Sequence, residues 1–289
     1  MTTTEFDPVR FKEQQRANWD GLSAGWLSVV DQFERGAAAV TARLLELGGV
    51  RPGLTVLDVG SGIGEPALSA ARAVGPTGRV VGVDLAPEMV AIARRRARGL
   101  GNVEFVVGDV ESLALPAGEF DAALSRWGLM FAPDRAAAFR SLAAVLKPGG
   151  VLAAAAWGPP ETAPMLSLGF QVLARQLELP APPPGTPGPF SMADPGEVSA
   201  ELSAAGFAGV SATWFDVEFV LDSRETFVEF NKAVTPPFLR RLLRERFGAD
   251  DDPRPWAAVA ERADGYRRAD GRIALPSRAL CLRATKPAV

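Results

Sequence analysis

Three glycines and an aspartate have the types and the spacing to bind a ribose-bearing ligand. The glycines directly follow an apolar run, at Gly60, Gly62 and Gly64. Glycine lets the backbone approach a ligand without a Cβ in the way. Asp84 ends the next apolar run about 20 residues after the last glycine, where a carboxylate can accept hydrogen bonds from both ribose hydroxyls. A simple tight turn and a helix cap are the alternative interpretations of the loop and of Asp84.

The residue after the third glycine indicates which of two classes of ligand the loop binds. Glu65 would repel the pyrophosphate of a dinucleotide, whereas it suits a ligand that bears an ammonium and a sulfonium. S-adenosylmethionine is such a ligand. A nicotinamide dinucleotide is the alternative that this part of the sequence leaves open.

These residues need a strand, a loop and a helix to position them. Residues 56–59 suit a buried parallel strand, and Pro66 opens an Ala-rich segment that predicts a helix, because proline is favoured in a first helical turn. The start of that helix would offer N–H donors and a partial positive charge to the ligand.

Strands and helices alternate over residues 51–157, which predicts a right-handed doubly wound parallel sheet of Rossmann-like class. In such a sheet ligands bind at the carboxyl ends of the strands, where all the candidate residues fall. We expect strands near 55–59, 79–84, 103–107, 120–125 and 150–156, and helices near 65–74, 87–98 and 134–146.

The segments on either side are less regular. Residues 1–48 predict two amphipathic helices, the second from Ala38 to Leu47. A stiff connector follows Trp157 and contains Pro180, Pro182, Pro183, Pro184, Pro187 and Pro189. Beyond it we expect helices over 193–205, 226–247 and 256–268 and strands over 210–220 and 273–284.

Composition narrows the classes of function. With 289 residues, 47% of them hydrophobic, the chain can bury a large core, and a net charge of -3 gives no reason to expect a nucleic-acid partner. The absence of histidine and the single cysteine, Cys281, predict no zinc site, no metal and no histidine base. We find no membrane span and no signal peptide, so we expect a cytoplasmic protein.

Residues 56–157 resemble the class I S-adenosylmethionine-dependent methyltransferases, particularly the ubiquinone and menaquinone C-methyltransferase group. The matching segments occur in family order and spacing: LDVGSGIG at 57–64, GVDLAPEM at 82–89, GDVESLALP at 108–116, FDAALSRWGLMF at 120–131 and LKPGG at 146–150. The resemblance covers roughly a third of the chain. The resemblance specifically indicates the fold and the cofactor, and it indicates almost nothing about the substrate.

The resemblance implies S-adenosylmethionine as cofactor and roles for particular residues. Asp109 would accept from the adenine amino group, and Val110 would offer its backbone N–H to the ring. Asp58 would orient the glycine loop or contact the methionine moiety, unless it only caps loop amides. The predicted cofactor residues are Asp58, Gly60, Ser61, Gly62, Gly64, Asp84, Leu85, Met89, Gly108, Asp109, Val110 and Ser125.

Fewer residues point to the acceptor of the methyl group. Arg126 and Trp127 end the fourth predicted strand, close to the expected methyl, and Phe131 follows them. Arg126 could orient a substrate oxygen or instead form a salt bridge with an acid of the N-terminal helices. Trp19 and Trp26 are candidate lid residues, or else ordinary core aromatics.

We therefore predict methyl transfer to a small, mostly apolar acceptor of aromatic, quinol or isoprenoid-like character, by in-line displacement without a histidine base. A nicotinamide-dependent oxidoreductase and a methyltransferase fold repurposed for another reaction are the alternatives. The expected organisation is a helical lid over 1–50, a cofactor-binding core over 51–157, and substrate-side helices with closing antiparallel strands over 158–289. The antiparallel pair resembles the one that closes methyltransferase sheets to seven strands.

Overall fold

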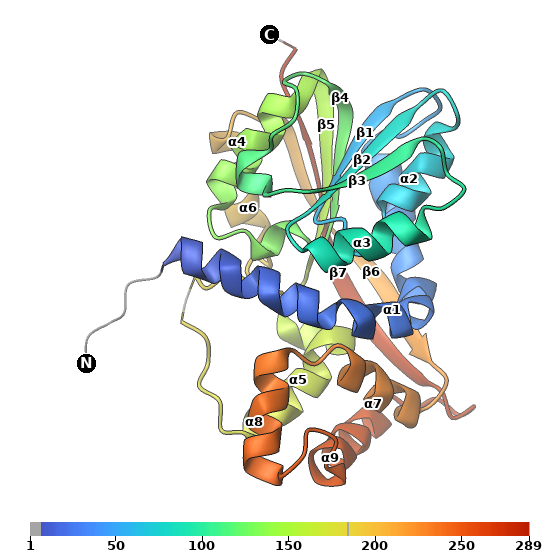
Figure 1. The fold of residues 1–289 in the computed structure, drawn as a ribbon, viewed down its shortest axis with the longest axis vertical. Helices are drawn as coiled ribbons and strands as arrows, with labels where there is room; N and C mark the ends of the chain where they lie inside the picture. The colour runs from blue at the N-terminus through green and yellow to red at the C-terminus, as the bar shows by residue number, and fades with distance from the viewer. Residues whose placement is uncertain (1–6, 184, 289) are drawn as a thin grey trace.

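A seven-stranded sheet forms the centre of the computed structural model, which describes residues 7–183 and 185–288 (Figure 1). The strand order is β3-β2-β1-β4-β5-β7-β6. The first five of these strands pair in parallel, whereas β7 runs antiparallel to both β5 and β6. This topology confirms the predicted doubly wound sheet and its closing antiparallel pair. The strands are β1 Thr55–Val59, β2 Arg79–Asp84, β3 Val103–Val107, β4 Phe120–Arg126, β5 Leu146–Trp157, β6 Ala208–Leu221 and β7 Ile273–Thr285.

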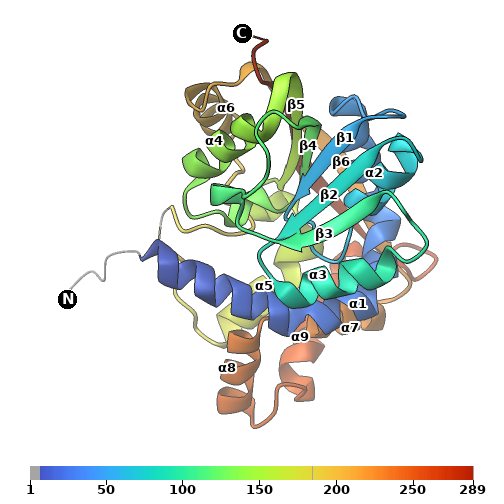
Figure 2. The ribbon, with the colours of Figure 1, turned by 45° about the horizontal axis from the view of Figure 1, so that its top comes forward.

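Helices cover both faces of the sheet. α4 and α6 pack side by side on one face, and α1 and α3 pack against each other on the opposite face (Figures 1 and 2). α7, α8 and α9 gather with α5 beside α1, away from the parallel strands. The helices are α1 Pro8–Leu47, α2 Ala67–Val74, α3 Pro87–Arg96, α4 Arg135–Val145, α5 Pro164–Gln176, α6 Pro195–Ala204, α7 Arg224–Ala233, α8 Pro237–Phe247 and α9 Pro253–Ala263.

The N-terminal segment is one helix of 40 residues, so the predicted break before Ala38 is wrong. Gly36, just before the predicted break, is buried where α1 crosses β6, and a side chain there would collide with the ring of Phe219. Glycine at this position therefore serves close packing rather than helix termination. Residues 1–6 of the predicted helices lie outside the described residues.

Other boundaries differ from expectation for local reasons. The predicted helix over 226–247 is two helices, because Pro236 and Pro237 separate α7 from α8 and a proline N–H is missing from the helix ladder. α9 begins at Pro253, earlier than expected, and ends at Ala263, earlier than the predicted Arg268. α5 was not predicted. Of the proline connector, Pro184 lies outside the described residues.

The core continues from the sheet into the helices without a break. β5 contributes four buried alanines in succession, at residues 153–156, and their small side chains let neighbouring elements approach closely. Among the helices described over 7–183 and 185–288, none combines the length and the apolar character that crossing a bilayer requires.

Candidate functional site

The glycine loop leaves β1 in a conformation that only glycine adopts readily. Gly60 has φ +67°, and a Cβ there would lie 2.8 Å from Cα of Gly128, just after β4. The amides of Gly60 and Ser61 donate to the carbonyl of Val83 at 2.8 and 3.1 Å. The loop is therefore fastened to β2 and touches the chain leaving β4.

Asp84, at the end of β2, accepts hydrogen bonds from both the glycine loop and the start of the next helix. Its Oδ2 accepts from the amide of Gly62 at 2.7 Å, and its Oδ1 accepts from the amide of Ala86 at 2.9 Å. Burial raises the pKa of Asp84, although these backbone donors oppose the rise. Each carboxylate oxygen can accept a second hydrogen bond, so the capping contacts leave room for the predicted ribose hydroxyls.

Asp58 in β1 carries an acceptor that no described residue of the protein uses. The side chain is fully buried, and its Oδ2 accepts from the amide of Ala67, at the start of α2, at 2.9 Å. Its Oδ1 and the hydroxyl of Ser61 are buried without a hydrogen-bond partner among the described residues. Buried polar atoms are rarely left unpaired. Two such atoms beside the glycine loop therefore fit a polar ligand such as the methionine end of S-adenosylmethionine.

Burial raises the pKa of Asp58 well above its ordinary value, and the charges of Glu65 and Asp84 add to the rise against the hydrogen bond from Ala67 and the charge of Arg126. Three carboxyl groups thus share the surroundings of the loop. A cationic ligand would favour the charged forms of these groups, because a nearby positive charge lowers the pKa of a carboxyl group.

The end of β3 meets the first turns of α1. Asp109 Oδ1 accepts from the amide of Glu111 at 2.9 Å, and Asp109 Oδ2 lies 2.6 Å from Nζ of Lys12, which also pairs with Glu111. Partial burial lowers the pKa of Lys12, but the two carboxylates more than offset this and raise it overall. The sequence analysis missed Lys12, since no local signal links residues 97 positions apart.

The other predicted cofactor residues occupy the same edge of the sheet. Leu85 and Val110 are half-buried just after β2 and β3, and the amide of Gly108 donates to the carbonyl of Asp84 at 3.0 Å. Met89 is buried within α3. The hydroxyl of Ser125 donates to the carbonyl of Val59 at 2.9 Å, which ties β4 to the strand before the loop.

Arg126 pairs with an acid of the N-terminal helix, which is the alternative foreseen from the sequence. Its Nη1 lies 2.8 Å from Glu34 Oε2 and 2.6 Å from the hydroxyl of Thr41, and its Nη2 also pairs with Glu34. The side chain is buried. Its guanidinium therefore joins β4 to α1 instead of standing free for a substrate.

Aromatic side chains gather beyond Arg126, and we call this group the aromatic cluster. The ring centroids of neighbouring members lie 4.2 to 6.4 Å apart. The members are Trp26, Phe33, Trp127, Trp157, Phe219 and Phe230. Trp26 is half-buried and contacts Phe33 and Phe230 at one end of the cluster. Trp19 makes a separate edge contact with Phe131, at 5.1 Å between centroids. The sequence analysis did not single out Phe33 or Phe219, because a strand or helix phenylalanine has no distinguishing local pattern.

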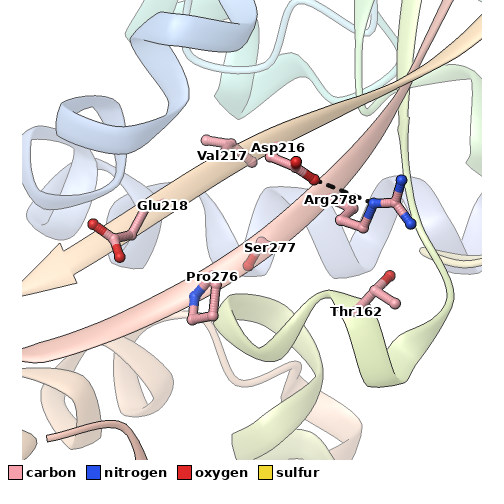
Figure 3. Close-up of a pocket in the computed structure, with 7 residues that line it drawn as sticks. All are labelled: Thr162, Asp216, Val217, Glu218, Pro276, Ser277 and Arg278. Atoms are coloured by element: carbon pink, nitrogen blue, oxygen red, sulfur yellow. Dashed lines mark ion pairs between the residues drawn. The ribbon is translucent and has the colours of Figure 1, made fainter.

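A cavity of about 360 Å³ lies elsewhere, on the β6–β7 pair (Figure 3). Asp216 and Arg278 form an ion pair at 3.2 Å across its wall, beside Thr162. It contains none of the predicted site residues. No group of three or more metal-ligating side chains occurs within residues 7–183 and 185–288.

Comparisons with known proteins agree with this geometry. Residues 56–150 match a family model described as a methyltransferase domain. A ubiquinone/menaquinone biosynthesis C-methyltransferase from Pseudomonas putida is 40% identical over 159 residues, which are 52% of this chain and 62% of that protein. The chain thus spans less than two thirds of the length of that relative.

Two further likenesses extend over more of the chain. Nocamycin O-methyltransferase from Saccharothrix syringae is 34% identical over 200 residues, which are 65% of this chain and 71% of that protein. The crystal structure of the cyclase SpnF superposes with a TM-score of 0.52 at 25% identity, covering 88% of this chain and 82% of the other.

Proposed function

Because this chain belongs to the class I S-adenosylmethionine-dependent methyltransferases, we propose that it transfers the methyl group of S-adenosylmethionine to a small, mostly apolar acceptor. The single observation that carries this proposal is the loop at Gly60–Gly64, fastened by Asp84 and flanked by the unpaired polar atoms of Asp58 and Ser61. Backbone donors, carboxylates and close backbone approach at one strand edge match a cationic nucleoside ligand.

Each residue of the loop region has a task in this proposal. Asp84 accepts from the ribose hydroxyls while it holds the loop, and Asp109 accepts from the adenine amino group. Asp58 faces the methionine ammonium with the oxygen that α2 leaves free. Because Gly60 has no side chain, the glycine loop packs directly against Gly128, just after β4. In this proposal the transferable methyl group therefore lies next to the residues that follow β4.

The sulfonium of the cofactor supplies the methyl group and the driving force for its transfer. The chain must therefore align the nucleophile and exclude water. With no histidine in the sequence and Glu34 paired to Arg126, the acceptor end offers no evident general base. This favours an acceptor that ionises readily or loses its proton to water.

α1 has the position of a lid in this proposal. Lys12 contacts the end of β3, and Asp20 Oδ1 accepts from the amide of Glu88, at the start of α3, at 2.9 Å. Residues 1–50 would thus cover a cofactor-binding core at 51–157, and residues 158–289 would enclose the acceptor. The names of the two relatives give methylation on carbon, in ubiquinone and menaquinone biosynthesis, for one and methylation on oxygen for the other.

Calorimetric titration with S-adenosylmethionine and S-adenosylhomocysteine tests the cofactor assignment. Asp84→Ala should weaken binding of both by roughly 1–3 kcal/mol, about 5- to 150-fold, because buried donors lose a charged partner. Asp121→Ala is the matched control, since Asp121 also accepts from a backbone amide, that of Thr55 at 2.8 Å, but at the end of β1 opposite the glycine loop. Unchanged affinity in Asp84→Ala would remove the ribose assignment.

A second candidate function is a non-methylating reaction on the same fold. The likeness to the cyclase SpnF and the lack of an evident base both favour it. Transfer of a labelled methyl group to phenols, quinols or small carboxylic acids would support the first proposal. Cofactor binding without transfer to any of these acceptors would favour the second.

A further inference from the structure

The two halves of the glycine loop are held by different elements. The amides of residues 60–62 donate to acceptors on β2, which attaches the first half to the sheet. The carbonyl of Ile63 instead accepts from Nη1 of Arg96 at 2.6 Å. Because Arg96 lies in the last turn of α3, the second half of the loop is attached to a helix.

Glycines surround this carbonyl and do not fix its direction. Gly62 and Gly64 flank Ile63 with φ of +50° and +121°, and a glycine backbone rotates with little steric restriction. The N–H of the same peptide group, that of Gly64, donates to the carbonyl of Ser61 at 2.8 Å, which is a bond within the loop. Of the two bonds at this peptide group, the one from Arg96 is therefore the one that reaches another element.

α3 also packs against the loop one turn before Arg96. A Cβ added to Gly64 would lie 3.7 Å from Cα of Ala93, which is buried. Ala93 and Arg96 are three residues apart, so they lie on the same side of the helix. The close contact at Ala93 thus brings α3 near enough for the side chain of Arg96 to reach the loop carbonyl.

The guanidinium of Arg96 donates to this carbonyl without pairing with an acid of the described chain. Within residues 7–183 and 185–288 it forms no ion pair, whereas Arg126 pairs with Glu34 and Arg135 pairs with two glutamates. A hydrogen bond from a charged donor is stronger than one between neutral groups. Since no carboxylate of these residues competes for the guanidinium, the bond to the loop keeps this strength.

We propose that Arg96 is a positioning residue for the cofactor, which holds the second half of the glycine loop in the shape that receives S-adenosylmethionine. This inference rests on the proposed function and adds a residue outside the predicted cofactor set. Without the bond to Ile63, the loop of the free chain samples other conformations, and the cofactor must order it on binding. That ordering lowers affinity, because preorganised sites bind more tightly.

Calorimetric titration of the full chain with S-adenosylhomocysteine tests the inference. Arg96→Met should weaken binding about tenfold, since the loop carbonyl loses a charged donor. Arg96→Lys keeps a charged donor and should recover most of the affinity. Arg94→Met is the matched control, because Arg94 lies on the same helix and donates to the carbonyl of Phe105, in β3, from Nε at 3.0 Å and Nη2 at 2.7 Å. Its affinity should stay unchanged.

Hydrogen exchange in the absence of cofactor gives a second, independent measurement. The backbone amides of residues 60–64 should exchange faster in Arg96→Met than in the unaltered chain, because local opening of the loop exposes them. The same amides should exchange at the original rate in Arg94→Met. Circular dichroism and urea unfolding establish that each variant is folded, so a general loss of stability is told apart from a change confined to the loop.

The outcomes separate this inference from the proposed function. Unchanged affinity in Arg96→Met, an equal loss in Arg94→Met, or a loss in Arg96→Lys as large as in Arg96→Met overturns the positioning role. So does loop exchange that stays at the original rate in Arg96→Met. In each of these cases binding of S-adenosylhomocysteine by the unaltered chain leaves the cofactor assignment standing. Failure of the unaltered chain to bind it would instead count against the proposed function itself.

Discussion

The cofactor end and the acceptor end of the candidate site are built in different ways. The cofactor end comes from three consecutive strand ends between residues 56 and 110, and its key contacts join backbone amides to carboxylates. The acceptor end gathers aromatic rings from α1, the residue after β4, β5, β6 and α7, over residues 26–230. One end depends on backbone conformation, and the other depends on which side chains distant elements bring together.

This difference predicts separate consequences for mutation. Most changes at the cofactor end should alter affinity for the cofactor with little effect on the rest of the fold, and the fully buried Asp58 is the expected exception. Changes at the acceptor end should alter stability and substrate preference, because the same side chains form the core between α1 and the sheet. The four predictions below test this separation.

The largest effect is expected where α1 joins the sheet. Arg126→Met should lower the free energy of unfolding by roughly 3–5 kcal/mol, since it leaves the largely buried Glu34 without its partner. Urea unfolding at neutral pH measures the loss. The double variant Glu34→Gln/Arg126→Met should recover much of it, and a single-variant loss below about 1 kcal/mol would contradict the expected role of this pair.

At the cofactor end, Gly60→Ala should weaken S-adenosylhomocysteine binding by roughly 2–3 kcal/mol, on the order of 100-fold. The added Cβ meets Gly128 at 2.8 Å in a backbone conformation that is already unfavourable for alanine. Gly62→Ala is the control, with a positive φ but no atom of the described residues within 4 Å, so only about 1 kcal/mol is expected. Similar losses in both variants would show that sterics at Gly128 do not matter.

Asp58 should make stability depend on pH in a defined direction. Because burial raises its pKa, folded Asp58 keeps its proton as the pH rises above its ordinary value of 3.8, whereas unfolded Asp58 loses it. Its contribution to the free energy of unfolding should therefore be largest at low pH and decline, by at most about 1.4 kcal/mol per pH unit, until the folded pKa is passed.

Asp58→Asn removes this titration and keeps an oxygen that can accept from Ala67. The stability of the unaltered chain relative to the variant should fall with rising pH in urea unfolding experiments. Asp84 titrates in both proteins, so the comparison removes its own contribution apart from its charge interaction with Asp58. A difference that stays constant or rises with pH would be inconsistent with a raised pKa for Asp58.

The smallest effect is expected at Lys12. Its ion pair with Asp109 is partly exposed, so Lys12→Met should cost less than about 1 kcal/mol of stability. If α1 acts as a lid, the variant should release S-adenosylhomocysteine faster in stopped-flow measurements, and added salt should narrow the difference from the unaltered chain. Lys147→Met, at the partly exposed pair with Asp121, is a control with no expected change in release.

The comparison of the two ends also explains which features could be predicted from the sequence. Apolar runs that end in Gly60 or Asp84 are local patterns, and the first four strands were predicted almost to the residue. Lys12 and Asp109, or Glu34 and Arg126, are more than 90 positions apart, and local periodicity carries no information about such pairs. The predicted roles of the cofactor residues follow from motif and position, and they stay predictions until binding is measured.

Helix boundaries were predicted less accurately than strand boundaries. Pro195 and Pro253 each occupy a first helical turn, yet the predicted helices began at residues 193 and 256. The break before Ala38 was predicted wrongly, and no local pattern shows that nearby Gly36 packs against Phe219, in a strand nearly two hundred residues later. α5 was not predicted because the neighbouring sequence is rich in proline and because its buried side is defined by packing against α7 and α9.

The position of β7 between β5 and β6 has a consequence for the order of events during synthesis. Both neighbours of β7 leave the ribosome before it does, so for that interval the edges of β5 and β6 have no strand between them. Open strand edges invite pairing with other chains. A ribosome that pauses before residue 273 would expose a nascent chain that already holds the entire glycine loop, and chaperones that shield strand edges would bind it at this stage.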